Sequence, residues 1–183
     1  MNGVYSFEHP DRFVTGTIGQ PGSRTFIVQA REGRRIASVA LEKQQVQQLA
    51  LRVGQVLDEL ELRGDDRAST PTHAVSDLAP LDLPLDEEFR VGAMTIGWDA
   101  DKARLLIQLF SVDVDEVSLL AELDDDLSRL EAFLTADQAR EFVARTQLVV
   151  SAGRPACPFC AQPINPEGHV CPRANGYRRD FAE

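Results

Sequence analysis

Residues 129–153 read RLEAFLTADQAREFVARTQLVVSAG, and two structural elements meet within this stretch. Residues 129–134 (RLEAFL) are typical of a short strand. Thr135 and Gln138 form the pattern of a capping box, with which many helices begin. Side chains of one stripe then recur at helical spacing, namely Ala139, Phe142, Val143, Thr146, Val149 and Val150. The stretch therefore predicts a strand followed directly by an amphipathic helix that lies on a sheet.

The same pattern occurs 93 positions earlier in the chain. Residues 34–41 (RRIASVAL) are strand-like, and residues 42–63 have one apolar and one polar face. The apolar stripe of this second predicted helix consists of Val46, Leu49, Ala50, Val53, Val56, Leu57 and Leu60. The shift places Leu41 on Leu134, Gln45 on Gln138, Leu49 on Phe142 and Arg52 on Arg145. The identities are few, so the pattern more than the sequence indicates two similar units.

Two strand-like runs precede each strand–helix pair. Residues 11–18 and 24–30 are separated by the turn residues GQPGS, and residues 89–98 and 103–112 flank a turn at 99–102. We therefore predict an α+β fold, in which an antiparallel sheet is built from two βββα-like units and carries two amphipathic helices. This domain spans residues 1–150 and has a possible internal duplication. Trp98, the single tryptophan, lies on a predicted strand and is expected to pack in the core.

Two segments do not fit this plan. Residues 64–88 contain three prolines and no sustained period, which favours a mobile connector over a lid. Residues 113–126 hold seven carboxylates, but they lack the ligand spacing and the glycine of an EF-hand loop. A solvated acidic connection is the better interpretation of that segment.

Composition limits the possible partners and the location. The formal net charge is −10, which opposes general binding to nucleic acid or to an anionic membrane. The N-terminal sequence has no apolar segment typical of a signal peptide, and no run of 18 uncharged apolar residues occurs. We expect a cytoplasmic protein without a membrane partner, whose partner is a protein or a small molecule. The oligomeric state is not readable from the sequence.

All three cysteines lie within residues 157–171 (CPFCAQPINPEGHVC), together with one of the three histidines. The spacing is Cys157-x2-Cys160-x8-His169-x-Cys171, and the prolines and the glycine between the two pairs favour a chain reversal. Three thiolates and one imidazole suit a tetrahedral Zn²⁺ ion. We predict a zinc knuckle within a C-terminal module of residues 151–183. His9, His73 or a water molecule remain alternatives to His169 as the fourth ligand.

Two further expectations concern the knuckle. The residue after its second cysteine often has a left-handed backbone, and here it is Ala161 rather than glycine. That conformation costs alanine about 1–2 kcal/mol, and metal binding outweighs this cost. Zinc with three thiolates and a neutral imidazole leaves a charge of −1, which Arg154 or Arg173 can offset.

The tail CPFCAQPINPEGHVCPRANGYRR and the opening SFEHPDRFVTGTIGQPGSRTF resemble the mainly actinobacterial domain-of-unknown-function family 3090. The resemblance covers nearly the whole chain, and its most specific part is the tail. It implies a cysteine-rich C-terminal module that ends in a CPR-x-NGYRR-like stretch. It implies no activity, substrate or catalytic residue.

The sequence contains few signs of catalysis. Cys157-Pro-Phe-Cys160 follows a predicted helix near the end of the chain, whereas redox CPxC pairs follow a strand and begin a helix. The H-x-E half of a zinc deaminase motif is missing, no Gly-Lys-Ser/Thr phosphate loop occurs, and no hydrolase motif is present. The leading interpretation is therefore a recognition or scaffold protein with a structural zinc site and no catalytic or cofactor-binding residues.

Two alternatives remain open. The first is a zinc-dependent enzyme in which the three cysteines hold the ion and water takes an open fourth position. The second is a binder of single-stranded nucleic acid that uses the tail, with Tyr177 and Phe181 stacking on bases. In that alternative three arginines of the same segment contact phosphates, namely Arg173, Arg178 and Arg179.

Overall fold

The fold was taken from a computed structural model, which describes residues 3–20, 22–65, 67, 77–111, 127–153, 157–162, 164 and 168–173. Along these residues the strands and helices follow in the order β1 (Val4–Phe7), β2 (Arg12–Ile18), β3 (Thr25–Glu32), β4 (Arg35–Leu41), α1 (Lys43–Leu62), β5 (Glu87–Arg90), β6 (Ala93–Asp99), β7 (Arg104–Phe110), β8 (Arg129–Leu134) and α2 (Ala136–Ser151). The acidic segment 113–126 and His73 lie outside the described residues. None of the described helices is both long enough and apolar enough to span a bilayer.

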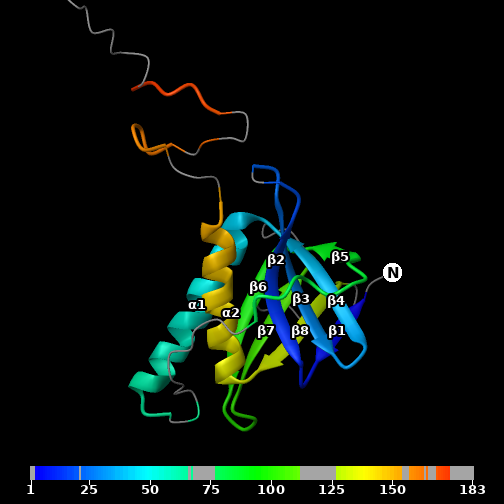
Figure 1. Ribbon diagram of the computed structural model, residues 1–183. Coiled ribbons are helices and arrows are strands. Elements are labelled where there is room, and N and C mark those ends of the chain that lie inside the picture. Colours follow the sequence, from blue (N-terminus) through cyan, green and yellow to red (C-terminus); the bar gives the residue numbers. More distant parts are fainter. Residues whose placement is uncertain are drawn as a thin grey trace, which may run out of the picture.

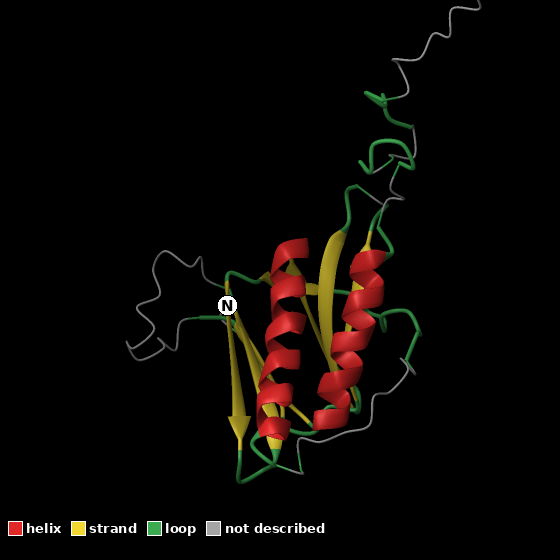
Figure 2. Ribbon diagram, turned by 90° about the vertical axis from the view of Figure 1, so that its left-hand side faces the viewer, coloured by secondary structure: helices red, strands yellow, loops and turns green. Residues whose placement is uncertain are grey.

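The strands form two four-stranded sheets, in the orders β1-β8-β7-β6 and β2-β3-β4-β5. Each sheet is an antiparallel three-stranded meander extended by one short parallel strand, β1 beside β8 and β5 beside β4. Helices α1 and α2 lie side by side, run in opposite directions and cover the strands from one side (Figures 1 and 2). The predicted α+β class and the two meander–helix units are confirmed. The sheets are mixed rather than wholly antiparallel, because each contains one short parallel strand. These two parallel pairings were not predicted.

The two units have the same strand register. In the first unit Gly16 lies opposite Ile27, which lies opposite Ala40. In the second unit Gly97 lies opposite Leu106, which lies opposite Phe133. Each residue of the first meander therefore has a structural counterpart in the second. Division into two domains and duplication remain predictions.

Both helices begin in the same way. Thr135 and Gln138 form the predicted capping box of α2, and Glu42 and Gln45 form a capping box on α1. The amide of Gln138 also donates to the carbonyl of Pro10 at 2.7 Å, and that of Gln45 to the carbonyl of Val91 at 2.9 Å. Each capping glutamine therefore fixes its helix to the chain that enters the first strand of the other unit's meander.

The core lies between the helices and the sheets. The largest side chains that are fully buried there include Phe7, Leu41, Leu49, Leu57, Leu105, Ile107, Leu109, Leu130, Leu134 and Phe142. Phe13 of β2 contacts Phe142 of α2, with ring centroids 5.0 Å apart. Each such side chain contributes about 1.5–3 kcal/mol by its burial. Trp98 packs against this core, as predicted.

Residues 77–82, which we call the strap, cross the outer face of the β2-β3-β4-β5 sheet. Thr15 of β2 contacts Thr146 of α2, so the next residue, Gly16, faces away from the helices. A Cβ atom added to Gly16 would lie 2.6 Å from the side chain of Leu81 in the strap. Gln29 binds the strap backbone in both directions, because its amide accepts from the Asp82 N–H and donates to the Asp82 carbonyl.

Two buried arginines hold the start of the strap. Arg12 is 8% exposed and Arg145 only 5%. Both pair with the carboxylate of Asp77, and both donate to the carbonyl of Ala79. Hydrogen bonding from Arg12 is the main cause that lowers the pKa of Asp77. The prediction of a mobile connector over 64–88 is therefore wrong for the strap itself.

Candidate metal centre

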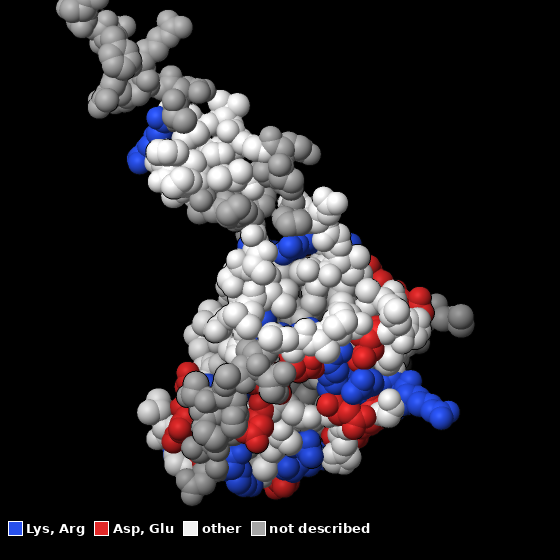
Figure 3. Space-filling model, in the orientation of Figure 1, with Lys and Arg blue, Asp and Glu red and all other residues white. Residues whose placement is uncertain are grey.

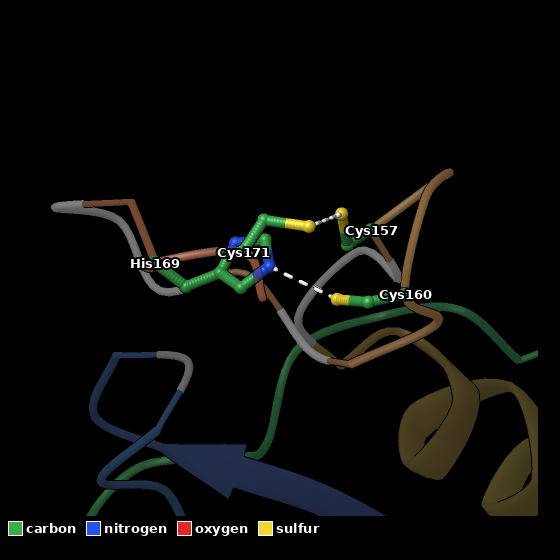
Figure 4. Close-up of side chains that lie close together, drawn as sticks. All are labelled: Cys157, Cys160, His169 and Cys171. Atoms are coloured by element: carbon green, nitrogen blue, oxygen red, sulfur yellow. Dashed lines mark hydrogen bonds between the residues drawn. The ribbon is translucent and has the colours of Figure 1, made fainter. Parts of the chain in front are cut away.

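The Cys/His module, residues 157–173, follows the end of α2 and lies beyond the sheets, away from their centre (Figure 1). Within it Cys157, Cys160, His169 and Cys171 point toward one another (Figure 4). One donor atom from each of the four residues lies within 4.8 Å of the other three. The Cys157 and Cys171 sulfurs are 3.8 Å apart, and the Cys160 sulfur is 3.2 Å from Nε2 of His169. These four residues therefore lie close enough to bind one metal ion.

The backbone of the first cysteine pair forms a tight turn. The Ala161 N–H donates to the Cys157 carbonyl, and the Cys157 N–H donates to the Gln162 carbonyl, each at 2.8 Å. Ala161 has a φ of +59°, so the predicted left-handed residue after the second cysteine is confirmed. Gly168, which directly precedes His169, has a φ of +90°. Each half of the site thus has a residue with a left-handed backbone next to a ligand residue.

The pKa values of the first two cysteines shift in opposite directions. Burial raises the pKa of the Cys157 thiol, but hydrogen bonds from the backbone N–H groups of Phe159 and Cys160 outweigh it, and the net shift is downward. The Gln162 N–H lowers the pKa of Cys160, yet burial and the neighbouring sulfurs of Cys157 and Cys171 raise it overall. Of these two cysteines Cys157 therefore has the lower pKa, and a bound divalent ion would favour the thiolate form of every cysteine that it contacts.

Arg173 lies against this turn. Its guanidinium donates to the carbonyl of Phe159 at 3.1 Å, between the first two cysteines. A cation at this position reduces the charge of −1 that three thiolates, a neutral imidazole and Zn²⁺ would carry. Arg154, the other arginine considered for this role, lies outside the described residues.

Other predicted site residues are not brought to the cluster. His9 lies between β1 and β2, where its backbone N–H donates to Glu32, and it does not belong to the group of four. His73, Tyr177, Phe181, Arg178 and Arg179 lie outside the described residues. A cavity of about 660 Å³ lies between α1 and the end of α2, with Lys43, Leu51 and Val150 among its lining residues. None of the four cluster residues lines that cavity.

The buried arginine cluster was missed from the sequence. Arg145 follows Phe142 by three residues and precedes Val149 by four, so it falls within the apolar stripe of α2. This spacing alone does not signal burial, because Arg52 of α1 has the same spacing from Leu49 and Val56 and is exposed. The partner, Asp77, is 68 residues away in sequence, and no local pattern links the two.

Comparison with known proteins identifies the family. The family described as Protein of unknown function (DUF3090) matches residues 5–171, which include both units and all four residues of the cluster. The chain belongs to this family. No curated protein and no solved structure matches it. Membership therefore agrees with the resemblance seen in the sequence and adds no activity to it.

Proposed function

We propose that the chain binds one zinc ion through Cys157, Cys160, His169 and Cys171, and that it acts as a recognition or scaffold protein with a structural metal site. The observation that carries the proposal is that four donor atoms lie within 4.8 Å of one another, in a module whose described residues bury no apolar side chain other than Cys157 and Cys171. Each part of this observation supports a different half of the proposal.

The donor geometry supports zinc. Four ligands in a tetrahedron with Zn–S bonds of about 2.3 Å place sulfur atoms about 3.8 Å apart. The separation of 3.8 Å between the Cys157 and Cys171 sulfurs agrees with that edge. A disulfide would need sulfurs at about 2.05 Å. Three thiolates and one imidazole are also a ligand set that zinc accepts readily.

The exposure of the module supports a structural role for the ion. Cys157 and Cys171 are buried, whereas the large apolar side chains beside them, Phe159 and Val170, are 65% and 80% exposed. A segment of this length without a core cannot offset its ordering entropy by burial. Structural zinc contributes on the order of 10 kcal/mol in small zinc peptides, which is enough to order such a module.

The same exposure supports recognition. Phe159 and Val170 each adjoin a ligand residue, so a bound ion would fix both apolar side chains toward solvent. A fixed apolar side chain binds a partner at a lower entropic cost than a mobile one. Four protein donors also fill a tetrahedral site, whereas a catalytic zinc keeps one position open for water or substrate.

The zinc content and the spectrum of a Co²⁺-substituted sample test this proposal. We expect one zinc per chain, and intense visible bands typical of tetrahedral cobalt with thiolate ligands. His169→Ala and Cys171→Ser should each lose tight zinc binding. Val170→Ala, which changes the exposed residue between these two ligands, should retain it.

Three results would contradict the proposal. Purified protein that is metal-free while residues 157–173 stay ordered would show that the ion is not needed. Equal zinc affinity of His169→Ala and the unmodified protein would remove His169 from the ligand set. A five-coordinate cobalt spectrum that changes with added small anions would indicate an open, catalytic position instead.

A further inference from the structure

The equivalence of the two units allows the strap site to be compared with its counterpart. The strap lies where the first unit's meander meets the second unit's helix, and it contacts Glu141 and Arg145 of α2, Gly16 of β2 and Gln29 of β3. The equivalent positions, where the second unit's meander meets the first unit's helix, carry Gln48 and Arg52 of α1, Gly97 of β6 and Gln108 of β7. Three of the four residues are therefore identical in type. In the fourth pair a glutamine replaces a glutamate and keeps a side-chain oxygen that can accept from a backbone N–H.

The counterpart positions have no such ligand among the described residues. Arg145 makes hydrogen bonds to the strap, whereas Arg52 is exposed and has no hydrogen bond or ion pair within the described part of the chain. A Cβ atom on Gly16 would collide with Leu81, whereas one on Gly97 would meet nothing within 4 Å. Gln29 pairs with the strap backbone, whereas the partners of the Gln108 side chain within the described residues are the side chains of Thr95 and Glu131.

The cavities differ in the same sense. The cleft between α2 and β2, which Arg145 and Glu141 line, includes Asp77 of the strap in its wall and measures about 120 Å³. The cleft between α1 and β6, which Arg52 and Gln48 line, measures about 480 Å³. The extra volume is on the scale of small ligand pockets, which begin at about 300 Å³. The site between α1 and β6 thus has room where the site between α2 and β2 holds a peptide segment.

We propose that the site formed by α1, β6 and β7 docks an extended peptide segment of a partner protein across β6, in the way that α2, β2 and β3 dock the strap. The segment carries one carboxylate, which pairs with Arg52, and four residues later an apolar side chain, which lies over Gly97. This spacing is that of Asp77 and Leu81 in the strap.

Two differences between the sites define the segment further. Arg12 and Arg31, which bind the carboxylate of Asp82, are replaced at their counterparts by Ala93 and Phe110. The docked segment therefore needs no second carboxylate after its apolar residue. The exposed cationic side chain of Arg52 favours the acidic residue at the start, because charge-assisted hydrogen bonds are stronger than neutral ones.

The strap itself supplies the probe, an acetylated and amidated peptide of sequence DLAPLDL, residues 77–83. The strap of the intact chain occupies its own site at a high effective concentration, because it is tethered there. Added peptide should therefore bind at the site formed by α1, β6 and β7. With the ¹⁵N-labelled full chain we expect shift changes at Gln48, Arg52, Gly97 and Gln108. The peptide with Asn in place of its first Asp should bind at least about tenfold more weakly.

Variants of the protein provide the matched test. Arg52→Ala should weaken peptide binding at least about tenfold. Arg63→Ala, which removes an exposed arginine at the end of the same helix, should leave binding within about twofold of the unmodified protein. Gly97→Val adds a side chain where the peptide's Leu should lie, and it should abolish binding while the thermal unfolding temperature is retained.

Four outcomes would overturn the inference. They are an absence of shifts at millimolar peptide, shifts confined to the strap site, full peptide affinity in Arg52→Ala, and self-association of the free chain through β6, which would make a second copy the occupant. Because this surface contains no residue of the Cys/His module, its failure leaves the zinc proposal standing. Loss of zinc binding by Cys171→Ser likewise leaves peptide binding unchanged.

Discussion

Replacing Ala161 by glycine should tighten zinc binding. Ala161 has a φ of +59°, a conformation that costs an L-residue about 1–2 kcal/mol and costs glycine nothing. Glycine also makes the unfolded module more flexible, which returns about 0.4–1 kcal/mol of that gain. The net gain is about 1 kcal/mol. Because zinc binding is expected to order the module, this gain adds to the free energy of zinc binding and corresponds to about fivefold higher zinc affinity.

The assay is competition for zinc with a chromophoric chelator at fixed pH. Ala103, in the turn between β6 and β7, provides a matched control because its φ is +51°. Ala103→Gly should raise the free energy of unfolding of the main body by a similar amount and leave zinc affinity unchanged. Ala161→Gly should do the reverse. Equal or lower zinc affinity of Ala161→Gly would refute the argument that a strained backbone is held in place by the ion.

Three further predictions concern the strap and the ion. The pKa of Asp77 is lowered in the folded state, so its ionised carboxylate stabilises the fold above the ordinary carboxyl pKa of about 3.9. This stabilisation is lost as the pH falls through the lower pKa of the folded state. In urea unfolding, the difference in unfolding free energy between the unmodified protein and Asp77→Asn should therefore shrink below about pH 4. Arg145→Leu should lower the free energy of unfolding by about 3 kcal/mol in the same assay, since it removes hydrogen bonds to the Asp77 and Ala79 carbonyls and leaves Arg12 as the remaining arginine partner of the strap. Arg52→Leu should change it by less than about 0.5 kcal/mol. Removal of zinc by a chelator should broaden or shift the NMR signals of residues 157–173 and leave the thermal unfolding temperature of the main body, residues 1–150, unchanged. A fall in that temperature together with these signal changes would count against a separate module.

Local patterns determined what the sequence could predict about the fold. The capping box at Thr135 and Gln138 and the apolar stripe behind it depend on neighbours a few residues apart, and the structure has both. Strand β1 was missed because the described strand with which it pairs, β8, lies more than a hundred residues later. Residues 89–98 read as one strand, but β5 and β6 belong to different sheets and the chain changes sheet at Val91 and Gly92.

The same limit applied to the sites. The proximity of Cys157, Cys160, His169 and Cys171 could be predicted because the four residues lie within fifteen positions, and because three thiols and an imidazole are donors that zinc accepts readily. The cluster of Arg12, Arg145 and Asp77 could not be predicted, because its three charged residues lie more than 60 residues apart in the sequence and are paired only by the fold. The strap was read as a mobile connector since its prolines and lack of period resemble those of unbound loops.

The exchange of β1 and β5 between the sheets has a consequence for folding. Strand β1 of the first half pairs with β8 of the second half, and β5 of the second half pairs with β4 of the first. Neither half alone can therefore complete its own sheet. Cutting the backbone within residues 68–76 should therefore yield two fragments that stay incomplete apart and regain structure only when mixed. Such reciprocal dependence makes the main body one cooperative unit despite its visible halves.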